Sequence, residues 1–228
     1  LTKKIFDAFL ISNAEIFIVL SSVKAVSDSI DSVLTENYKP QPKTHYGKSK
    51  LLAEKYILSK QIPKGKRVYI LRPCMIHGPL NKGNLNLLYN IVTKRFPWPL
   101  GAFDNKRSFC SVDNLMFIIK EIILNPNIAS GIYNVSDDIS LSTNQVIRLI
   151  SKSTNSKPLI WKISKTLINF LAVLGDNISL LPLNSERLKK ITESYIVSNK
   201  KIVKAIGKNL PITSEEGLLN TFKTFKQH

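Results

Sequence analysis

Hydrophobic positions near the start of the chain follow two patterns in turn. Residues 3–10 place apolar side chains four positions apart, which predicts a helix, and residues 16–20 form a continuous apolar run, which predicts a buried strand. The same patterns then recur, with a helix predicted over residues 46–59 and a second buried strand over residues 67–71 that a proline stops. Buried strands separated by helices indicate an α/β fold in which helices cover both faces of a parallel sheet.

Beyond residue 79 the pattern changes to shorter elements. It predicts helices over residues 85–94 and 112–124 and a strand over residues 131–135, and Ser142 has the character of a helix N-cap. Further helices are predicted after Ser164, Asn184, Ser198 and Thr213, the last opening with the capping-box sequence Thr213-Ser214-Glu215-Glu216. No internal repeat or low-complexity linker interrupts the chain, so we place a domain boundary at the change of pattern, giving regions 1–78 and 79–228.

Composition favours a globular protein with a charged surface. The chain has 228 residues, is 43% hydrophobic and carries a formal net charge of +17, so it is long and apolar enough to bury a core. The 27 lysines and 6 arginines are scattered without basic blocks, which favours a solvated surface over a nucleic-acid groove. The longest apolar stretch, residues 163–183, is interrupted by polar and charged residues, so we predict no integral membrane segment.

Two cysteines, Cys74 and Cys110, lie in apolar surroundings without the spacing of metal ligands. They fit two small core side chains in a reducing cytosol, and we predict no metal site.

Tyr46 and Lys50 lie four residues apart in the predicted helix over residues 46–59 and therefore share one helix face. A phenol can act as a base near neutral pH only if adjacent positive charge stabilises its phenolate. The spacing alone is weak evidence, because Tyr56 and Lys60 repeat it at the far end of the same helix. The residues around each pair must therefore indicate which of the two is the candidate catalytic pair.

Short motifs surround the first pair in a defined order. They are residues 17–22, Pro40-Gln41-Pro42, Tyr46-Gly47-Lys48-Ser49-Lys50, Leu71-Arg72-Pro73, His77-Gly78-Pro79, Asn84-Leu85, Lys106-Arg107-Ser108-Phe109, Val112-Asp113-Asn114-Leu115 and Tyr133-Asn134-Val135. Together they resemble the C-terminal two thirds of an extended short-chain dehydrogenase/reductase, in the NAD-dependent epimerase/dehydratase family that includes UDP-glucose 4-epimerase. The branch most similar is that of bacterial surface-polysaccharide clusters.

The resemblance implies an incomplete Rossmann-type parallel sheet whose first four strands are missing, followed by a smaller, mixed α/β substrate-binding region with some elements packing back on the first domain. The nine glycines form no Gly-rich turn that could hold a pyrophosphate. In the family, that turn follows the first strand of the sheet, so we expect that this sequence is a truncated family member that lacks it. The implied cofactor is NAD, with NADP left open.

The resemblance also implies roles for residues of the first region. Tyr46 would be the general acid/base on a sugar hydroxyl, and Lys50 would stabilise its phenolate and hold the nicotinamide ribose. Ser22 would assist Tyr46, because Val23 occupies the position that usually carries Ser or Thr in the family. Ser21, Pro73 and His77 would line the cofactor pocket, although a packed loop histidine is an equal alternative for the last.

For the substrate, the resemblance implies that Asn84 and Arg107 contact the diphosphate of a UDP-sugar, where a guanidinium suits phosphate oxygens. Arg187 is a further candidate, with an ordinary surface arginine as its alternative. Dehydratases of the family carry an Asp-Glu pair where this chain has Lys24 and Ala25. Hydride removal and return at a sugar carbon, at C4 for instance, is therefore favoured over loss of water.

The sequence thus predicts a cytoplasmic, NAD-dependent UDP-sugar epimerase of polysaccharide synthesis, a homodimer when full length. A keto-sugar reductase of the same family would use the same residues. A non-catalytic relic or binding subunit would explain Val23 and the absent glycine turn.

Overall fold

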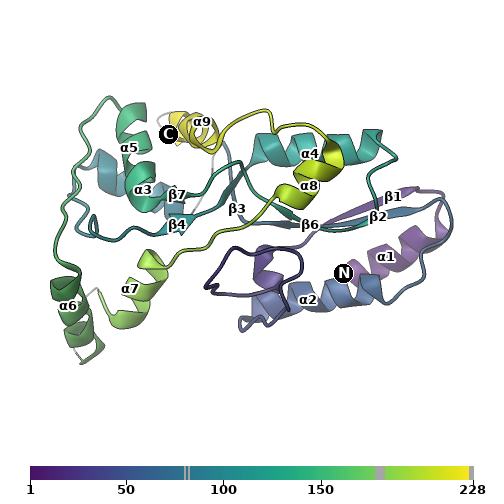
Figure 1. Cartoon of the computed structure of the whole chain (residues 1–228), viewed down its shortest axis with the longest axis horizontal. Coiled ribbons are helices and arrows are strands. Elements are labelled where there is room, and N and C mark those ends of the chain that lie inside the picture. The colour runs from purple at the N-terminus through teal and green to yellow at the C-terminus, as the bar shows by residue number, and fades with distance from the viewer. Residues whose placement is uncertain (80, 82, 178–182, 226–228) are drawn as a thin grey trace. The chain divides into compact units, whose positions relative to one another are not determined.

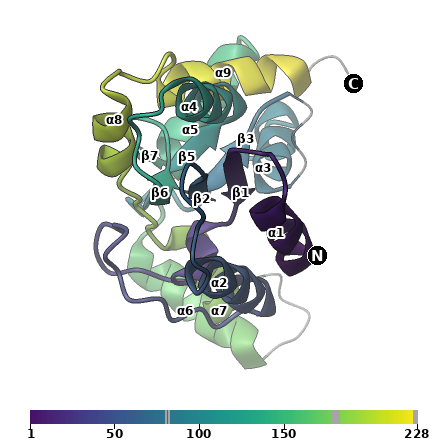
Figure 2. The same cartoon turned by 90° about the vertical axis from the view of Figure 1, so that its right-hand side faces the viewer.

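The computed structural model describes residues 1–79, 81, 83–177 and 183–225, so part of the apolar stretch noted above, residues 178–182, lies outside the described residues. The elements are α1 (Thr2–Ile11), β1 (Ile16–Leu20), the 3₁₀ turn η1 (Val23–Ala25), α2 (His45–Leu58), β2 (Arg67–Pro73), β3 (Met75–His77), α3 (Asn84–Thr93), β4 (Lys106–Arg107), β5 (Phe109–Ser111), α4 (Val112–Leu124), β6 (Gly131–Val135), β7 (Leu141–Ser142), α5 (Thr143–Ser153), α6 (Lys165–Asn177), α7 (Ser185–Thr192), α8 (Lys200–Ile206) and α9 (Ser214–Phe225) (Figure 1, Figure 2).

Contacts divide the chain into two compact units, each assembled from separate segments. Unit 1 comprises Leu1–Ile76, Ser108–Ile139 and Ile196–Ser214. Unit 2 comprises His77–Arg107, Ser140–Tyr195 and Glu215–His228.

Unit 1 is built on a parallel sheet in the order β1-β2-β6. Ile18 pairs with Tyr69, and Leu71 pairs in turn with Tyr133. The sheet confirms the parallel α/β arrangement predicted from the alternation of helices and buried strands.

Neighbouring side chains of the sheet face opposite helical layers. Val68 and Ile70 of β2 pack with Phe6 of α1 and Ile57 of α2. On the other face, Tyr69 and Leu71 pack against side chains of α4 and α8, including Ile118, Ile122, Ile202 and Ile206. Both views show α2 and α4 on opposite sides of the strands (Figure 1, Figure 2). Since every strand contributes apolar residues to both faces, its continuous apolar run follows directly from burial on both sides.

Unit 2 is made of short strands and helices. β4 and β7 pair antiparallel, and α6 and α7 enclose a small core that includes Leu100, Ile168 and Leu188. Ser142 caps α5 in a capping box with Gln145, which confirms the predicted cap. These short elements position Arg107, which lies in β4.

Most predicted elements lie within one or two residues of their observed bounds, but two details differ. β2 continues to Pro73 instead of ending at residue 71, because Pro73 occupies the last position of the strand and pairs with Val135. The strands of two or three residues, β3, β4, β5 and β7, were not predicted, since so few residues carry no periodicity.

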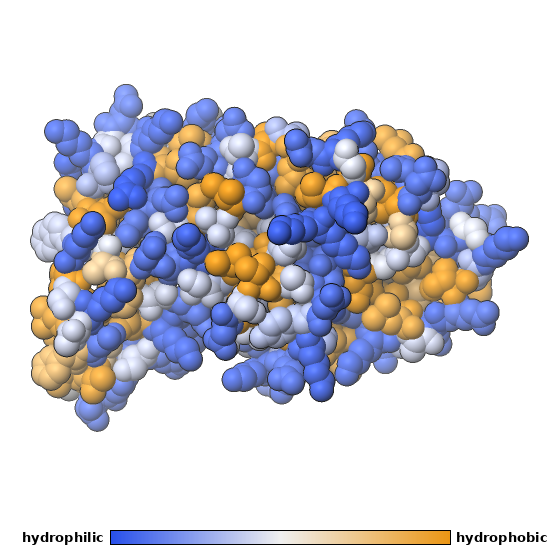
Figure 3. Space-filling model, in the orientation of Figure 1, coloured by the Kyte–Doolittle hydropathy of each residue, from blue (hydrophilic) through white to orange (hydrophobic). Residues whose placement is uncertain are grey.

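Cys74 and Cys110 are free thiols at the core of unit 1, as expected. Burial raises the pKa of both thiols, so they stay in the neutral form. Within the described residues, no helix combines the length and apolar character needed to cross a membrane. Hydrophilic side chains are spread over the face seen in Figure 3, with apolar ones interspersed.

Candidate active site

The helix that carries Tyr46 and Lys50 begins at a well-fixed point. Thr44 is the N-cap of α2, and its hydroxyl oxygen accepts a hydrogen bond from the Gly47 N–H at 3.2 Å. The Asp28 carboxylate in turn accepts bonds from the N–H groups of Lys43 at 2.7 Å and Thr44 at 3.0 Å. Burial raises the pKa of Asp28, but these bonds and one from the Thr44 hydroxyl outweigh it and hold the pKa below its ordinary value.

Tyr46 and Lys50 lie on one face of α2 at the carboxyl end of β1. The Lys50 ammonium donates to the Leu20 carbonyl oxygen at 2.9 Å and lies 5.7 Å from the centre of the Tyr46 ring. The Tyr46 side chain is 56% exposed. A phenol open to a ligand and a nearby fixed cation are thus brought together as the sequence predicted.

The segment that follows β1 carries two buried hydroxyls. Ser21 donates through its hydroxyl to the Glu54 carboxylate, so its side chain is directed to α2. The Ser22 oxygen accepts the Lys24 N–H at 3.2 Å as the N-cap of η1, which leaves the Ser22 hydroxyl hydrogen to donate elsewhere. Val23 is buried at 3% exposure, so the position expected to carry Ser or Thr packs into the interior.

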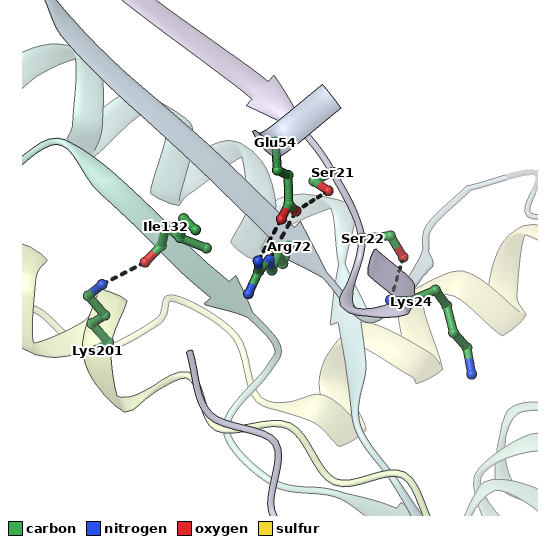
Figure 4. Close-up of polar contacts among 7 residues, drawn as sticks. All are labelled: Ser21, Ser22, Lys24, Glu54, Arg72, Ile132 and Lys201. Carbon is green, nitrogen blue, oxygen red and sulfur yellow. Dashed lines mark hydrogen bonds and ion pairs between the residues drawn. The ribbon is translucent and has the colours of Figure 1, made fainter. Parts of the chain in front are cut away.

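Glu54 and Arg72 form a pair that the sequence pattern did not predict. Their side chains are buried, and the guanidinium contacts both carboxylate oxygens, at 2.9 Å and 2.5 Å (Figure 4). Glu54 lies one helical turn after Lys50 and directly follows the apolar residues 51–53. An acidic residue at that spacing was the available signal.

Gly47 allows α2 to approach η1 closely. A Cβ at this position would lie 2.3 Å from the Lys24 carbonyl oxygen and 2.8 Å from the Pro42 Cβ. No side chain larger than hydrogen fits there without movement, which explains the glycine directly after Tyr46.

Tyr56 and Lys60 repeat the cation-over-ring geometry but in a different environment. The Lys60 ammonium lies 4.9 Å from the centre of the Tyr56 ring. The Tyr56 hydroxyl, however, donates to the Asp7 carboxylate at 2.7 Å and so links α2 to α1. This tyrosine is committed to helix packing.

The other predicted site residues lie in unit 2, except for Pro73, which ends β2 in unit 1. His77 is buried, and its Nδ1 lies 2.9 Å from the Thr221 hydroxyl, which matches the packed-histidine alternative. Asn84 is exposed at the first position of α3.

Arg107 contacts the end of α7, and Arg187 lies within that helix. Arg107 donates to the carbonyl oxygens of Lys190 and Glu193 at the end of this helix, and burial lowers the pKa of its guanidinium while Glu193 opposes that shift. Arg187 lies exposed in the first turn of α7. In this structure Arg107 therefore satisfies helix-end carbonyls, a role the sequence did not indicate.

The described residues contain no group of three or more His, Cys, Asp or Glu side chains arranged to hold a metal ion. In unit 1, hydroxyl, phenol and ammonium groups gather instead at the carboxyl end of a parallel strand, the edge where ligands bind in open α/β sheets. A phenol beside an ammonium is suited to moving a proton to and from a bound alcohol.

Comparisons with known proteins show which family the chain belongs to. The model of the NAD dependent epimerase/dehydratase family matches residues 1–136. UDP-glucose 4-epimerase from Vibrio cholerae is 28% identical over 224 residues, covering 95% of this chain and 65% of that protein. N-acetyl-alpha-D-glucosaminyl-diphospho-ditrans,octacis-undecaprenol 4-epimerase from Escherichia coli O157:H7 is 34% identical over 125 residues, covering 54% of this chain and 38% of that protein.

Among solved structures, UDP-glucuronic acid 4-epimerase from Bacillus cereus in complex with NAD superposes with a TM-score of 0.72 at 16% identity, covering 99% of this chain and 66% of that one. This likeness shows a shared fold. The chain spans just under two thirds of the length of the Vibrio relative, at 65%. With the family model matching more than half of its residues, the chain belongs to the NAD-dependent epimerase/dehydratase family.

Proposed function

We propose that this protein epimerises a UDP-linked sugar, at C4, with NAD as its cofactor, in the synthesis of cell-surface polysaccharide. The observation that carries the proposal is the exposed Tyr46 phenol beside the Lys50 ammonium at the carboxyl end of β1. Similarity to two 4-epimerases supports the choice of reaction.

The residues present fit the nicotinamide end of such a cofactor. Lys50 is held at the strand end by the Leu20 carbonyl, where its remaining N–H groups can reach a ribose hydroxyl. Ser21 and Ser22 directly follow β1, and Pro73 is the last residue of the neighbouring strand β2. When bound, NAD would supply the hydride acceptor and donor for oxidation and reduction of the sugar carbon.

Side chains of the protein transfer the proton of the sugar hydroxyl. The Tyr46 phenolate oxygen takes the proton of the sugar hydroxyl as the carbon is oxidised, and returns it when the carbonyl is reduced. Positive charge on Lys50 would stabilise the phenolate by Coulomb attraction. Ser22 donates its hydroxyl hydrogen to the same sugar oxygen.

Asn84, Arg107 and Arg187 are proposed to contact the diphosphate of the substrate. Arg107 already binds two carbonyl oxygens, so a phosphate would compete with the end of α7 for its N–H groups. A sugar joined by diphosphate to a polyprenol is a second candidate substrate, supported by the 34% identity to the undecaprenol-linked 4-epimerase.

The test is Tyr46→Phe in the full-length protein, with Tyr56→Phe as the matched control. We expect Tyr46→Phe to lower turnover of the UDP-sugar by at least about 100-fold with substrate binding retained, and the control to keep its turnover. Unchanged turnover in Tyr46→Phe would overturn the proposal. Substrate-dependent, stoichiometric loss of reduced nicotinamide absorbance would identify a keto-sugar reductase in its place.

We also propose that the full-length protein is a cytoplasmic homodimer that uses α1 and α2. Exposed apolar side chains on these helices, Ile5, Leu52 and Leu58, support this interface. Sedimentation of Leu52→Glu should show a shift to monomer. The free thiols of Cys74 and Cys110 support a reducing compartment, which cell fractionation would test.

A further inference from the structure

The Glu54 carboxylate is the most deeply buried acidic group beside the candidate site. It is 1% exposed, and Arg72 is 2% exposed. Arg72 Nε lies 2.9 Å from Glu54 Oε1 and its terminal nitrogen lies 2.5 Å from Oε2, while the Ser21 hydroxyl donates to Oε1 (Figure 4). One carboxylate therefore joins α2, β2 and the end of β1.

The position of Glu54 relates this network to the proposed catalytic groups. On α2, Tyr46, Lys50 and Glu54 follow one another at intervals of four residues and share one face. Lys50 holds Leu20, and Glu54 holds the next residue, Ser21, whose own N–H donates to the Leu71 carbonyl at 2.7 Å. Two consecutive turns of α2 thus form hydrogen bonds with Leu20 and Ser21, the two residues directly before Ser22.

Stability alone does not account for a buried ion pair here. Removing two charges from water is costly, and replacing such a pair by apolar side chains of similar volume often leaves a protein equally or more stable. A fixed, bidentate contact does, however, define geometry closely. Catalysis by proton transfer depends on such geometry, since a displacement of about 1 Å can lower a rate by about 100-fold.

We propose that Glu54 and Arg72 are positioning residues that set Ser22 against Tyr46 and Lys50. The inference rests on the proposed function, because it assigns these three residues to the reaction. Glu54 acts through Ser21 and the helix, and neither Glu54 nor Arg72 contacts substrate.

The experiment separates positioning from stability with an apolar exchange of the pair in the full-length protein. Glu54→Gln alone leaves a buried guanidinium without its counter-charge, so its Tm should fall. The double variant Glu54→Leu/Arg72→Met removes both charges and should regain much of the Tm. Its kcat should nevertheless remain about 10- to 100-fold below that of the wild type, with KM for the UDP-sugar within about twofold. A double variant with wild-type kcat would overturn the proposal.

A matched control uses the ion pair between Glu121 and Lys208, 2.8 Å apart in the same unit. Glu121→Leu/Lys208→Met should keep its kcat. If the double variant at Glu54 and Arg72 fails to fold, Ser21→Ala takes its place, because it removes only the link from the carboxylate to the strand end. Its kcat should fall while its Tm changes little, and an unchanged kcat would count against the proposal.

A second readout does not depend on activity. In Glu54→Leu/Arg72→Met, or in Ser21→Ala, the backbone amides of Ser21 and Lys24 should exchange with solvent faster than in the wild type at matched global stability. Unchanged exchange would contradict positioning. If exchange rises but Tyr46→Phe proves fully active, the proposed function fails while the positioning of this strand end stands.

Discussion

The Lys50 ammonium lies 2.9 Å from the carbonyl oxygen of Leu20, so a side chain in the second turn of α2 reaches the last residue of β1. This contact fixes the cation at the carboxyl end of the strand. The Tyr46 ring, one turn earlier on the helix, is thereby presented to the same edge of the sheet.

Lys50→Met should abolish most of the proposed activity while preserving the fold. The thioether chain keeps the apolar stem but removes the charge that stabilises a phenolate, so we expect kcat/KM to fall by roughly 100-fold or more. Steady-state kinetics on the full-length protein provide the measurement. Lys60→Met serves as the control, because its ammonium lies beside Tyr56, and equal losses in both variants would refute the assignment.

Gly47→Ala tests the close approach of α2 to η1. Helix propensity alone predicts a gain of about 1 kcal/mol for alanine. The clash of a Cβ with the Lys24 carbonyl oxygen at 2.3 Å opposes this gain, and we expect a net loss of about 1–3 kcal/mol in the free energy of unfolding. Urea denaturation measures the change, and a stabilised variant would show that the segments separate freely. Gly65→Ala, where no atom lies within 4 Å of the added Cβ, isolates the cost of a positive φ without a clash.

Asp28→Asn should make stability less dependent on acid pH. The pKa of Asp28 is lowered in the folded protein, so its contribution is present above the unfolded value of about 3.9 and is lost as pH falls through the folded value. The variant should therefore be less stable than wild type at neutral pH and equal to it at a pH well below 4.

Urea denaturation at both pH values checks this expectation for Asp28. Asp31→Asn, an exposed acidic residue nearby, controls for loss of a negative charge. A stability difference for Asp28→Asn that persists at the acid pH would contradict the explanation.

Ser142→Ala should weaken α5 in unit 2. The Ser142 oxygen accepts the Gln145 N–H at 3.1 Å, and the Gln145 side chain accepts the Ser142 N–H at 2.8 Å. Loss of such an N-cap costs about 1 kcal/mol. Thermal unfolding compared with Thr143→Ala, the next residue in the helix, gives the measurement; a Tm loss no larger than that of the control would exclude the capping contribution.

The sequence predicted the long elements well because burial on both faces gives β1 and β2 unbroken apolar runs, and four-residue spacing marks α1. It also predicted that Tyr46 and Lys50 share a face, since this follows from helical geometry alone. Arg107 was harder. Its guanidinium binds carbonyls more than 80 residues further along the chain, a contact set by tertiary packing.

The Glu54–Arg72 pair was missed for the same reason. It joins residues 18 apart in sequence, and Ser21 lies 33 residues before Glu54. Each of the three residues is unremarkable by itself, and only the parallel pairing of β1 with β2 places them together.

The alternation of faces along β2 gives the buried pair a consequence for how the chain reaches its fold. Leu71 faces the helical layer that contains α4. Arg72, two residues after Ile70, faces the opposite layer and contacts Glu54 of α2. A slip of β2 by one residue would exchange the two faces and drive a guanidinium into the apolar layer without a counter-charge. The pair therefore adds an energetic penalty against this misalignment, since only correctly aligned strands neutralise Arg72.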